Sequence, residues 1–309
     1  EKLKKFANEN DTKWIIGNGW DQNNWPTKKW PTNEQLNNTF PDHNVVLNRI
    51  DGHALMANKR AILTAKINPD TTIYGGHIEI INHELTGIFV DNAMDLILNH
   101  VPIPSEETNK KALITAQNTC FSLGLTTVDI AGLTKESVEL IDKLHNSEEL
   151  KIKTYIMLTD NEENFNHYVI NLNGPIKTKK MNVRSFKFFA DGSLGSRGAC
   201  LINPYLDNQR THGQLLQNID TFNTKLNTLK LYGFQACTHA IGDSANRIIT
   251  SSYANVLDGS NDLRWRIEHV QCITDKDIEI LGKHNIIPSV QPTHATSDFS
   301  LSLIHISEP

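Results

Sequence analysis

The chain has 309 residues, of which 39% are apolar and 21% charged, and its 30 Lys and Arg against 35 Asp and Glu give a formal net charge of −5. This composition is typical of a soluble globular protein. The acidic balance indicates no nucleic-acid partner, no apolar run approaches the roughly 20 residues of a membrane span, and four cysteines without a C-x-x-C pair exclude a zinc ribbon and a disulfide scaffold.

Residues 1–89 are predicted to form a loop-rich N-terminal part. Trp, Asn and Pro are frequent over residues 1–60, and turn sequences such as Gly17-Asn18-Gly19 interrupt this stretch. One short strand is predicted at Val45–Leu47. The opening residues resemble the middle of an amphipathic helix without a signal-peptide core, so we expect the chain to begin inside a longer protein.

Strands and helices alternate from about residue 90 to residue 290. The helices show apolar residues at helical spacing, as at Val138, Ile141 and Leu144. Such alternation favours a parallel sheet built of βα units. The first strand is not followed by a G-x-G-x-x-G motif, so a dinucleotide-binding fold has no support. The predicted strands cover residues 125–128, 152–158, 183–190, 234–239, 266–270 and 286–290.

An α/β barrel of the (β/α)8 type carries its active site at the carboxyl ends of its strands. Such a barrel needs eight strands and about 250 residues, and only six strands are predicted here. Three consecutive predicted strands carry Lys187, His239 and His269 near these ends. Neutral imidazole is a common metal ligand, and carboxylation by CO₂ would turn a buried Lys into an anionic oxygen ligand. A single His at a strand end is usually a packed residue, but the coincidence on successive strands favours a metal site.

The segment from Phe189 to Ala199, FADGSLGSRGA, closely resembles the F-A-D-G-A-L-G-S-R-G-A signature of the YtcJ-like branch of the amidohydrolase superfamily, which includes N-substituted formamide deformylases. The resemblance extends from about residue 13 to residue 299. Further matching segments are Gly19-Trp20-Asp21-Gln22, Arg49-Ile50-Asp51-Gly52-His53-Ala54, the stretch 239–247, Arg266-Ile267-Glu268-His269 and the stretch 289–298.

This resemblance implies a metal-dependent hydrolase on a (β/α)8 TIM barrel. The family's ligands match Lys187, which is often carboxylated, together with His239 and His269, and the cofactor is a divalent metal, which we expect to be zinc as one or two ions. The family's first-strand His-x-His pair and eighth-strand Asp have no counterpart. We therefore expect a partial barrel of about strands 2–7 over residues 90–299, an inserted segment within residues 1–89, and an unmatched tail over residues 300–309.

Five further residues are assigned to the expected site. Asp191 and His294 are the catalytic candidates, and Trp20, His53 and Gln291 are the substrate-binding candidates. Each has an alternative: Asp191 as a partner of a metal ligand or a helix cap, His53 as a solvated or packed loop residue, and Trp20 as a residue that packs locally. The side chains of Gln291 and His294 are predicted to face the mouth of the barrel.

The reaction that the resemblance implies is hydrolysis of a non-peptide carbon–nitrogen bond of the amide or formamide type by metal-activated hydroxide, with a small-molecule amide as substrate. Two alternatives stay open. One is a cyclic-amide hydrolase or deaminase of the same superfamily, and the other is a catalytically inactive fragment or regulatory relative. The sequence leaves open the cellular compartment and the formation of a homo-oligomer.

Overall fold

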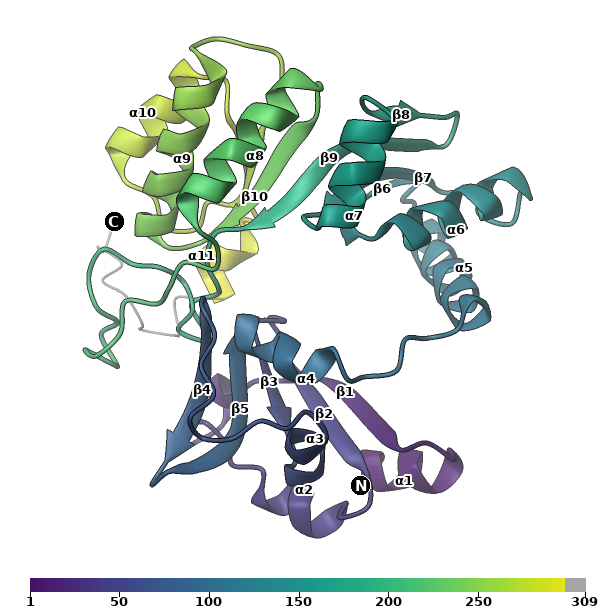
Figure 1. The fold of residues 1–309 in the computed structure, drawn as a ribbon, viewed down its shortest axis with the longest axis vertical. Helices are drawn as coiled ribbons and strands as arrows, with labels where there is room; N and C mark the ends of the chain where they lie inside the picture. Colours follow the sequence, from purple (N-terminus) through teal and green to yellow (C-terminus); the bar gives the residue numbers. More distant parts are fainter. Residues whose placement is uncertain (298–309) are drawn as a thin grey trace.

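A computed structural model describes residues 1–297 as two sheets with their helices (Figure 1). The expected tail over residues 300–309 lies outside the described residues. None of the helices within residues 1–297 has the length and apolar character needed to span a membrane.

The N-terminal sheet has five strands in the order β1-β2-β3-β5-β4, with β1 and β2 parallel and the other pairs antiparallel. The prediction of a loop-rich segment therefore missed a sheet, although its short strand at residues 45–47 is confirmed within β2. The strands are β1 (Trp14–Trp20), β2 (Asn44–Arg49), β3 (Ala54–Ala57), β4 (Gly76–Ile81) and β5 (Glu84–Asp91). The short helices beside them are α1 (Lys2–Glu9), η1 (Gln22–Asn24), α2 (Glu34–Thr39), α3 (Lys59–Thr64), η2 (Asn92–Met94) and α4 (Asp95–Leu98).

The second sheet confirms all six strands of the predicted alternation. They run parallel in the order β12-β11-β10-β9-β7-β6, and the short β8 pairs antiparallel with β9. The strands are β6 (Thr127–Leu133), β7 (Lys153–Thr159), β8 (Ile176–Lys177), β9 (Met181–Phe189), β10 (Gln235–Ala240), β11 (Arg266–His269) and β12 (Ile287–Ser289).

Helices cover one face of this parallel sheet, where alternate strand residues build the main apolar core. On β9, Phe186 packs against Phe234 and Phe188 packs against Phe222, with ring centroids 5.3 Å apart in both pairs. The covering helices are α5 (Glu106–Ser122), α6 (Lys135–Asn146), α7 (Glu162–Asn164), the π-helical η3 (Phe165–Asn171), α8 (Ile219–Leu231), α9 (Asp243–Leu257) and α10 (Asp275–Lys283). The short α11 (Thr293–Ser297) follows β12 and lies apart from them.

The opposite face of the parallel sheet is concave and carries polar side chains. Tyr155 of β7 hydrogen-bonds Gln235 of β10 across the intervening strand β9. On β9, Ser185 and Lys187 are buried on this face, while Phe186 and Phe188 point to the helices. The six strands thus form a half-barrel of parallel strands, and its inner face is the place where a polar site is built.

Candidate functional site

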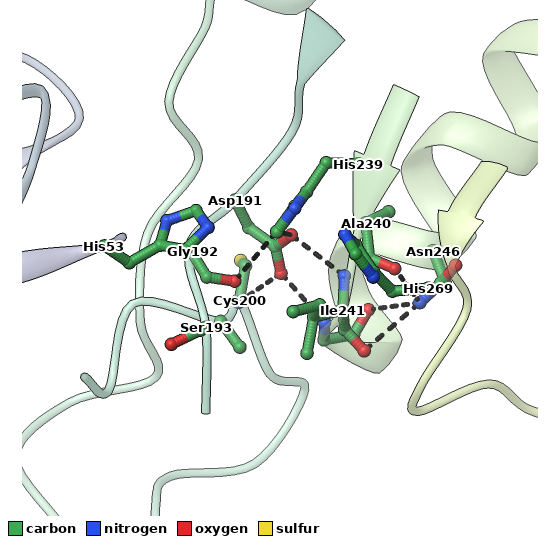
Figure 2. Close-up of polar contacts among 12 residues, drawn as sticks. His53, Asp191, Gly192, Ser193, Cys200, His239, Ala240, Ile241, Asn246 and His269 are labelled. Atoms are coloured by element: carbon green, nitrogen blue, oxygen red, sulfur yellow. Dashed lines mark hydrogen bonds and ion pairs between the residues drawn. The ribbon is translucent and has the colours of Figure 1, made fainter. Parts of the chain in front are cut away.

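Four histidine rings form a row beside the carboxyl ends of β9, β10 and β11. The ring centroids of His53 and His239 are 4.8 Å apart, those of His239 and His269 are 4.7 Å apart, and those of His269 and His294 are 5.8 Å apart. Figure 2 shows the rings of His53, His239 and His269 with the loop that follows β9. The structure therefore brings together the two histidines expected as metal ligands and adds one neighbour on each side.

In both His239 and His269, one ring nitrogen is bonded to an oxygen and the other has no hydrogen-bond partner within the part of the chain that the structure describes. The Nε2 of His239 lies 3.1 Å from the carbonyl oxygen of Gly192, and the Nδ1 of His269 lies 2.7 Å from the Oε1 of Gln291. Burial lowers the pKa of both rings, so both are neutral imidazoles at pH 7. A neutral ring with one nitrogen held by an oxygen has the form that metal-binding histidines take.

Lys187 lies on the same inner face of the half-barrel and is 6% exposed. Its Nζ donates to the carbonyl oxygen of Phe188 at 3.1 Å and lies 3.7 Å from the ring centroid of Phe189. Burial lowers its pKa to about 8, which raises the fraction of neutral amine available to react with CO₂. The charge of Lys187 in turn lowers the pKa of His239 and His269, so the three groups share one environment.

These donors fit a divalent metal by their chemistry, because neutral imidazole nitrogens and an oxygen ligand suit zinc and similar cations. In the part of the chain that the structure describes, however, no three His, Cys, Asp or Glu side chains are grouped so that they could hold a metal ion. His239 and His269 are therefore two candidate ligands, and the described side chains of these four types do not complete a metal-binding set around them. Lys187, which carries an oxygen ligand only after carboxylation, is the remaining predicted member.

Asp191 is fully buried, and backbone amides engage both of its carboxylate oxygens. Its Oδ1 accepts from Ile241 at 3.0 Å, and its Oδ2 accepts from Gly242 and Cys200 at 2.8 Å each (Figure 2). Burial raises its pKa to about 7, and its Oδ1 lies 3.5 Å from the Nε2 of His239. This arrangement matches the alternative of a residue that supports a ligand, because the carboxylate ties the loop after β9 to the loop after β10.

The remaining predicted residues lie in different places. Gln291 bonds His269 and the Ser289 carbonyl oxygen, so its amide holds the ring of a candidate ligand. His294 ends the histidine row, and its buried Nδ1 has no hydrogen-bond partner among residues 1–297. Trp20 donates to the Leu47 carbonyl oxygen at 2.7 Å and packs against two other tryptophans of the N-terminal part, in agreement with local packing.

Sequence reasoning missed a buried polar cluster that joins the two sheets. Arg49 is 4% exposed and forms ion pairs with Asp21 and Asp51. Asp51 in turn accepts from the hydroxyl of Ser193 in the loop after β9. The side chain of Gln22 accepts from Arg49 Nε at 2.7 Å and donates to the Gly195 carbonyl oxygen at 3.2 Å. The three segments that resemble the family, 19–22, 49–54 and 189–199, therefore meet in space. Their shared resemblance was the signal in the sequence that could have indicated this cluster.

Asp91, the last residue of β5, was not among the site residues predicted from the sequence. Its Oδ1 lies 2.8 Å from the Nδ1 of His53. Burial lowers the pKa of His53, but the hydrogen bond and charge of Asp91 outweigh it, and the pKa of His53 is raised. Burial also raises the pKa of Asp91 itself.

Comparison with known proteins relates the chain to one family. The profile of the amidohydrolase family matches residues 1–304, a range that reaches into the stretch 300–309. "Putative amidohydrolase YtcJ" of Bacillus subtilis is 30% identical over 295 residues, which are 93% of this chain and 54% of that protein. "Protein LONG AFTER FAR-RED 3" of Arabidopsis thaliana is 28% identical over 313 residues, 96% of this chain and 54% of that protein. The chain thus spans about half the length of these relatives.

Two solved structures resemble the chain. An uncharacterized metal-dependent hydrolase from Pyrococcus furiosus superposes with a TM-score of 0.70 at 26% identity, covering 97% of this chain and 60% of that one. One from Pyrococcus horikoshii OT3 superposes with a TM-score of 0.73 at 22% identity, covering 98% and 59%, and this second likeness bears on the fold alone. Together with the resemblance of the signature loop, the family match settles the relationship, and the chain belongs to the amidohydrolase family.

Proposed function

We propose that this chain is part of a metal-dependent hydrolase that cleaves non-peptide carbon–nitrogen bonds of the amide or formamide type. We further propose that its half-barrel is about strands 2–7 of a (β/α)8 barrel. The observation that carries the proposal is the pair His239 and His269 at the carboxyl ends of parallel strands. Their rings are 4.7 Å apart, and one nitrogen of each has no hydrogen-bond partner among residues 1–297. The printed name of the Pyrococcus furiosus structure, a metal-dependent hydrolase, supports the assignment of a metal.

In this proposal His239, His269 and a carboxylated Lys187 hold the cation, which we propose to be zinc as one or two ions. When bound, such a cation polarises a carbonyl group and lowers the pKa of its water far below that of bulk water, toward 7. The protein's part is to fix its ligands. The Gly192 carbonyl oxygen takes the Nε2–H of His239 and the Gln291 Oε1 takes the Nδ1–H of His269, so both rings keep the tautomer that ligation needs.

The surroundings of the donors suit a small, uncharged substrate. Phe189 is 46% exposed, and its ring centroid lies 5.6 Å from that of His239, so an apolar group of a substrate can pack on it beside the ligands. Asp191 holds the two adjoining loops together through three backbone amides. In the proposed reaction the carbonyl group lies toward His239 and the nitrogen substituent lies toward Phe189.

The test measures metal and activity separately. Zinc affinity by calorimetry is expected to fall at least about tenfold in His239→Ala and His269→Ala and to stay unchanged in His145→Gln, a buried histidine of α6 that bonds Ile152. Formamides, cyclic ureas and aminopurines are then offered as substrates. Absence of bound zinc, or activity that survives Lys187→Ala and His239→Ala, would contradict the proposal, and hydrolysis restricted to cyclic ureas or aminopurines would favour the cyclic-amide or deaminase alternative.

A further inference from the structure

The N-terminal sheet places one histidine against the metal-site candidates. His53 follows β2 in the chain, and its ring lies 4.8 Å from that of His239 and 6.3 Å from that of Phe189. Its Nδ1 is bonded to Asp91, and its Nε2 has no hydrogen-bond partner among residues 1–297. The side chain of His53 is 13% exposed, whereas that of Asp91 is fully buried. A buried carboxylate thus fixes the ring while the other nitrogen stays accessible.

The carboxylate of Asp91 is placed by a strained backbone and by close packing against two glycines. Asp91 has a φ of 53°, a conformation that non-glycine residues seldom adopt. The loop after β9 makes room for its oxygens with two glycines, because a Cβ on Gly192 or Gly198 would lie 2.4 Å or 2.2 Å from Asp91 Oδ2. Strained backbone of this kind is characteristic of functional sites, where it serves to position a group.

His53 lies beside the metal ligands and outside their set. If His53, His239 and His269 could share one cation, they would form a group of three donors, and no such group occurs among the described residues. The free Nε2 is therefore available to another partner. The ring of His53 lies beside those of Phe189 and His239, where the proposed substrate binds.

We propose that His53 hydrogen-bonds the amide group of the substrate through Nε2, and that Asp91 is the positioning residue that orients the ring of His53. This inference rests on the proposed function and extends it by making the N-terminal sheet one wall of the substrate site. An amide offers both a carbonyl acceptor and an N–H donor, so either charge form of the ring finds a partner. The contact depends on orientation, since Asp91 leaves Nε2 as the nitrogen that faces the substrate.

The experiment follows the imidazole nitrogens directly. The metal-free chain is labelled with ¹⁵N-histidine, and N-methylformamide is titrated as the probe while the ring signals are recorded by NMR. The Nε2 signal of His53 is expected to shift with saturation, and the signal of His145 is expected to stay in place. Asp91→Asn should remove the shift, whereas Asp277→Asn, a change at another buried carboxylate, should keep it.

Two further measurements separate the roles. The zinc affinity of His53→Gln should equal that of the unmodified chain, and its kcat/KM for a hydrolysed amide should fall about 10- to 100-fold. Loss of zinc affinity as large as that of His239→Ala, or a His53 signal that does not move at saturating probe, would overturn the inference. A chain that binds no zinc but whose His53 signal moves would contradict the proposed function and support the contact.

Discussion

The Nη1 of Arg266 on β11 donates to the Oδ2 of Asp129 on β6 at 2.9 Å, although β10, β9 and β7 separate these two strands in the sheet. A flat sheet would place strands four positions apart about 19 Å from each other. The contact therefore requires the sheet to curl, so that side chains from β11 and β6 meet on its inner face. Arg266 also donates through Nε to Glu268 at 2.8 Å, so one guanidinium joins two carboxylates inside the half-barrel.

Removing this guanidinium is expected to cost more than removing its distal partner. The side chain of Glu268 is 10% exposed, so Arg266→Met leaves a buried carboxylate without its partner and should lower the free energy of unfolding by about 1–3 kcal/mol. The side chain of Asp129 is 47% exposed, and Asp129→Asn should lower it by at most about 1 kcal/mol. Urea denaturation followed by circular dichroism measures both, and an equal loss in the two variants would contradict the argument.

The cluster around Arg49 is expected to hold the N-terminal sheet to the loop after β9. Arg49→Met leaves the carboxylates of Asp21 and Asp51 unpaired and should reduce stability by about 3–5 kcal/mol. The control is Arg264→Met, which removes an ion pair with Asp262 whose side chains are 70% and 84% exposed and should change stability by less than about 1 kcal/mol. Denaturation midpoints that move together in both variants would show that the cluster does not stabilise the fold.

The parallel strands could be predicted from the sequence because they alternate with helices whose apolar residues recur at helical spacing. The N-terminal sheet lacked such a signal. Its β4 and β5 are joined by Asn82 and His83, which both have positive φ, at 53° and 62°. Asn often occupies such a turn but His seldom does, so the hairpin has no usual turn sequence. The parallel pairing of β1 and β2 also joins segments that are about 30 residues apart.

The site was predictable where it depends on strand ends and unpredictable where it depends on packing between distant segments. Lys187, His239 and His269 follow from their positions on successive strands. The bond from Asp91 to His53 spans 38 residues and crosses between separate strands, and that from Gln291 to His269 spans 22. Neither pair shares a motif, so only the folded chain shows that an oxygen fixes each ring.

The glycines beside Asp91 give a prediction about space. Gly198→Ala would place a Cβ 2.2 Å from Asp91 Oδ2, which forces the carboxylate or the loop to move and should cost about 1–3 kcal/mol of stability. Gly282→Ala is the matched change, because Gly282 lies in helix α10 with no atom within 4 Å of the added Cβ. That variant should gain about 0.5–1 kcal/mol. Thermal unfolding checks both, and a neutral Gly198→Ala would disprove tight packing at Asp91.

The hydrogen bond between Gln291 and His269 gives a prediction about metal affinity. Gln291 Oε1 accepts the Nδ1–H of His269. Gln291→Leu removes this acceptor, so the ring is no longer held in the tautomer with the proton on Nδ1 and can turn away. Zinc affinity should fall about 10- to 100-fold, as measured by competition with a fluorescent chelator. The control is Gln209→Leu, which changes an amide that donates to two carbonyl oxygens of its own loop. Equal affinity in the two variants would show that the backbone alone, which has a φ of 76° at His269, holds the ring in place.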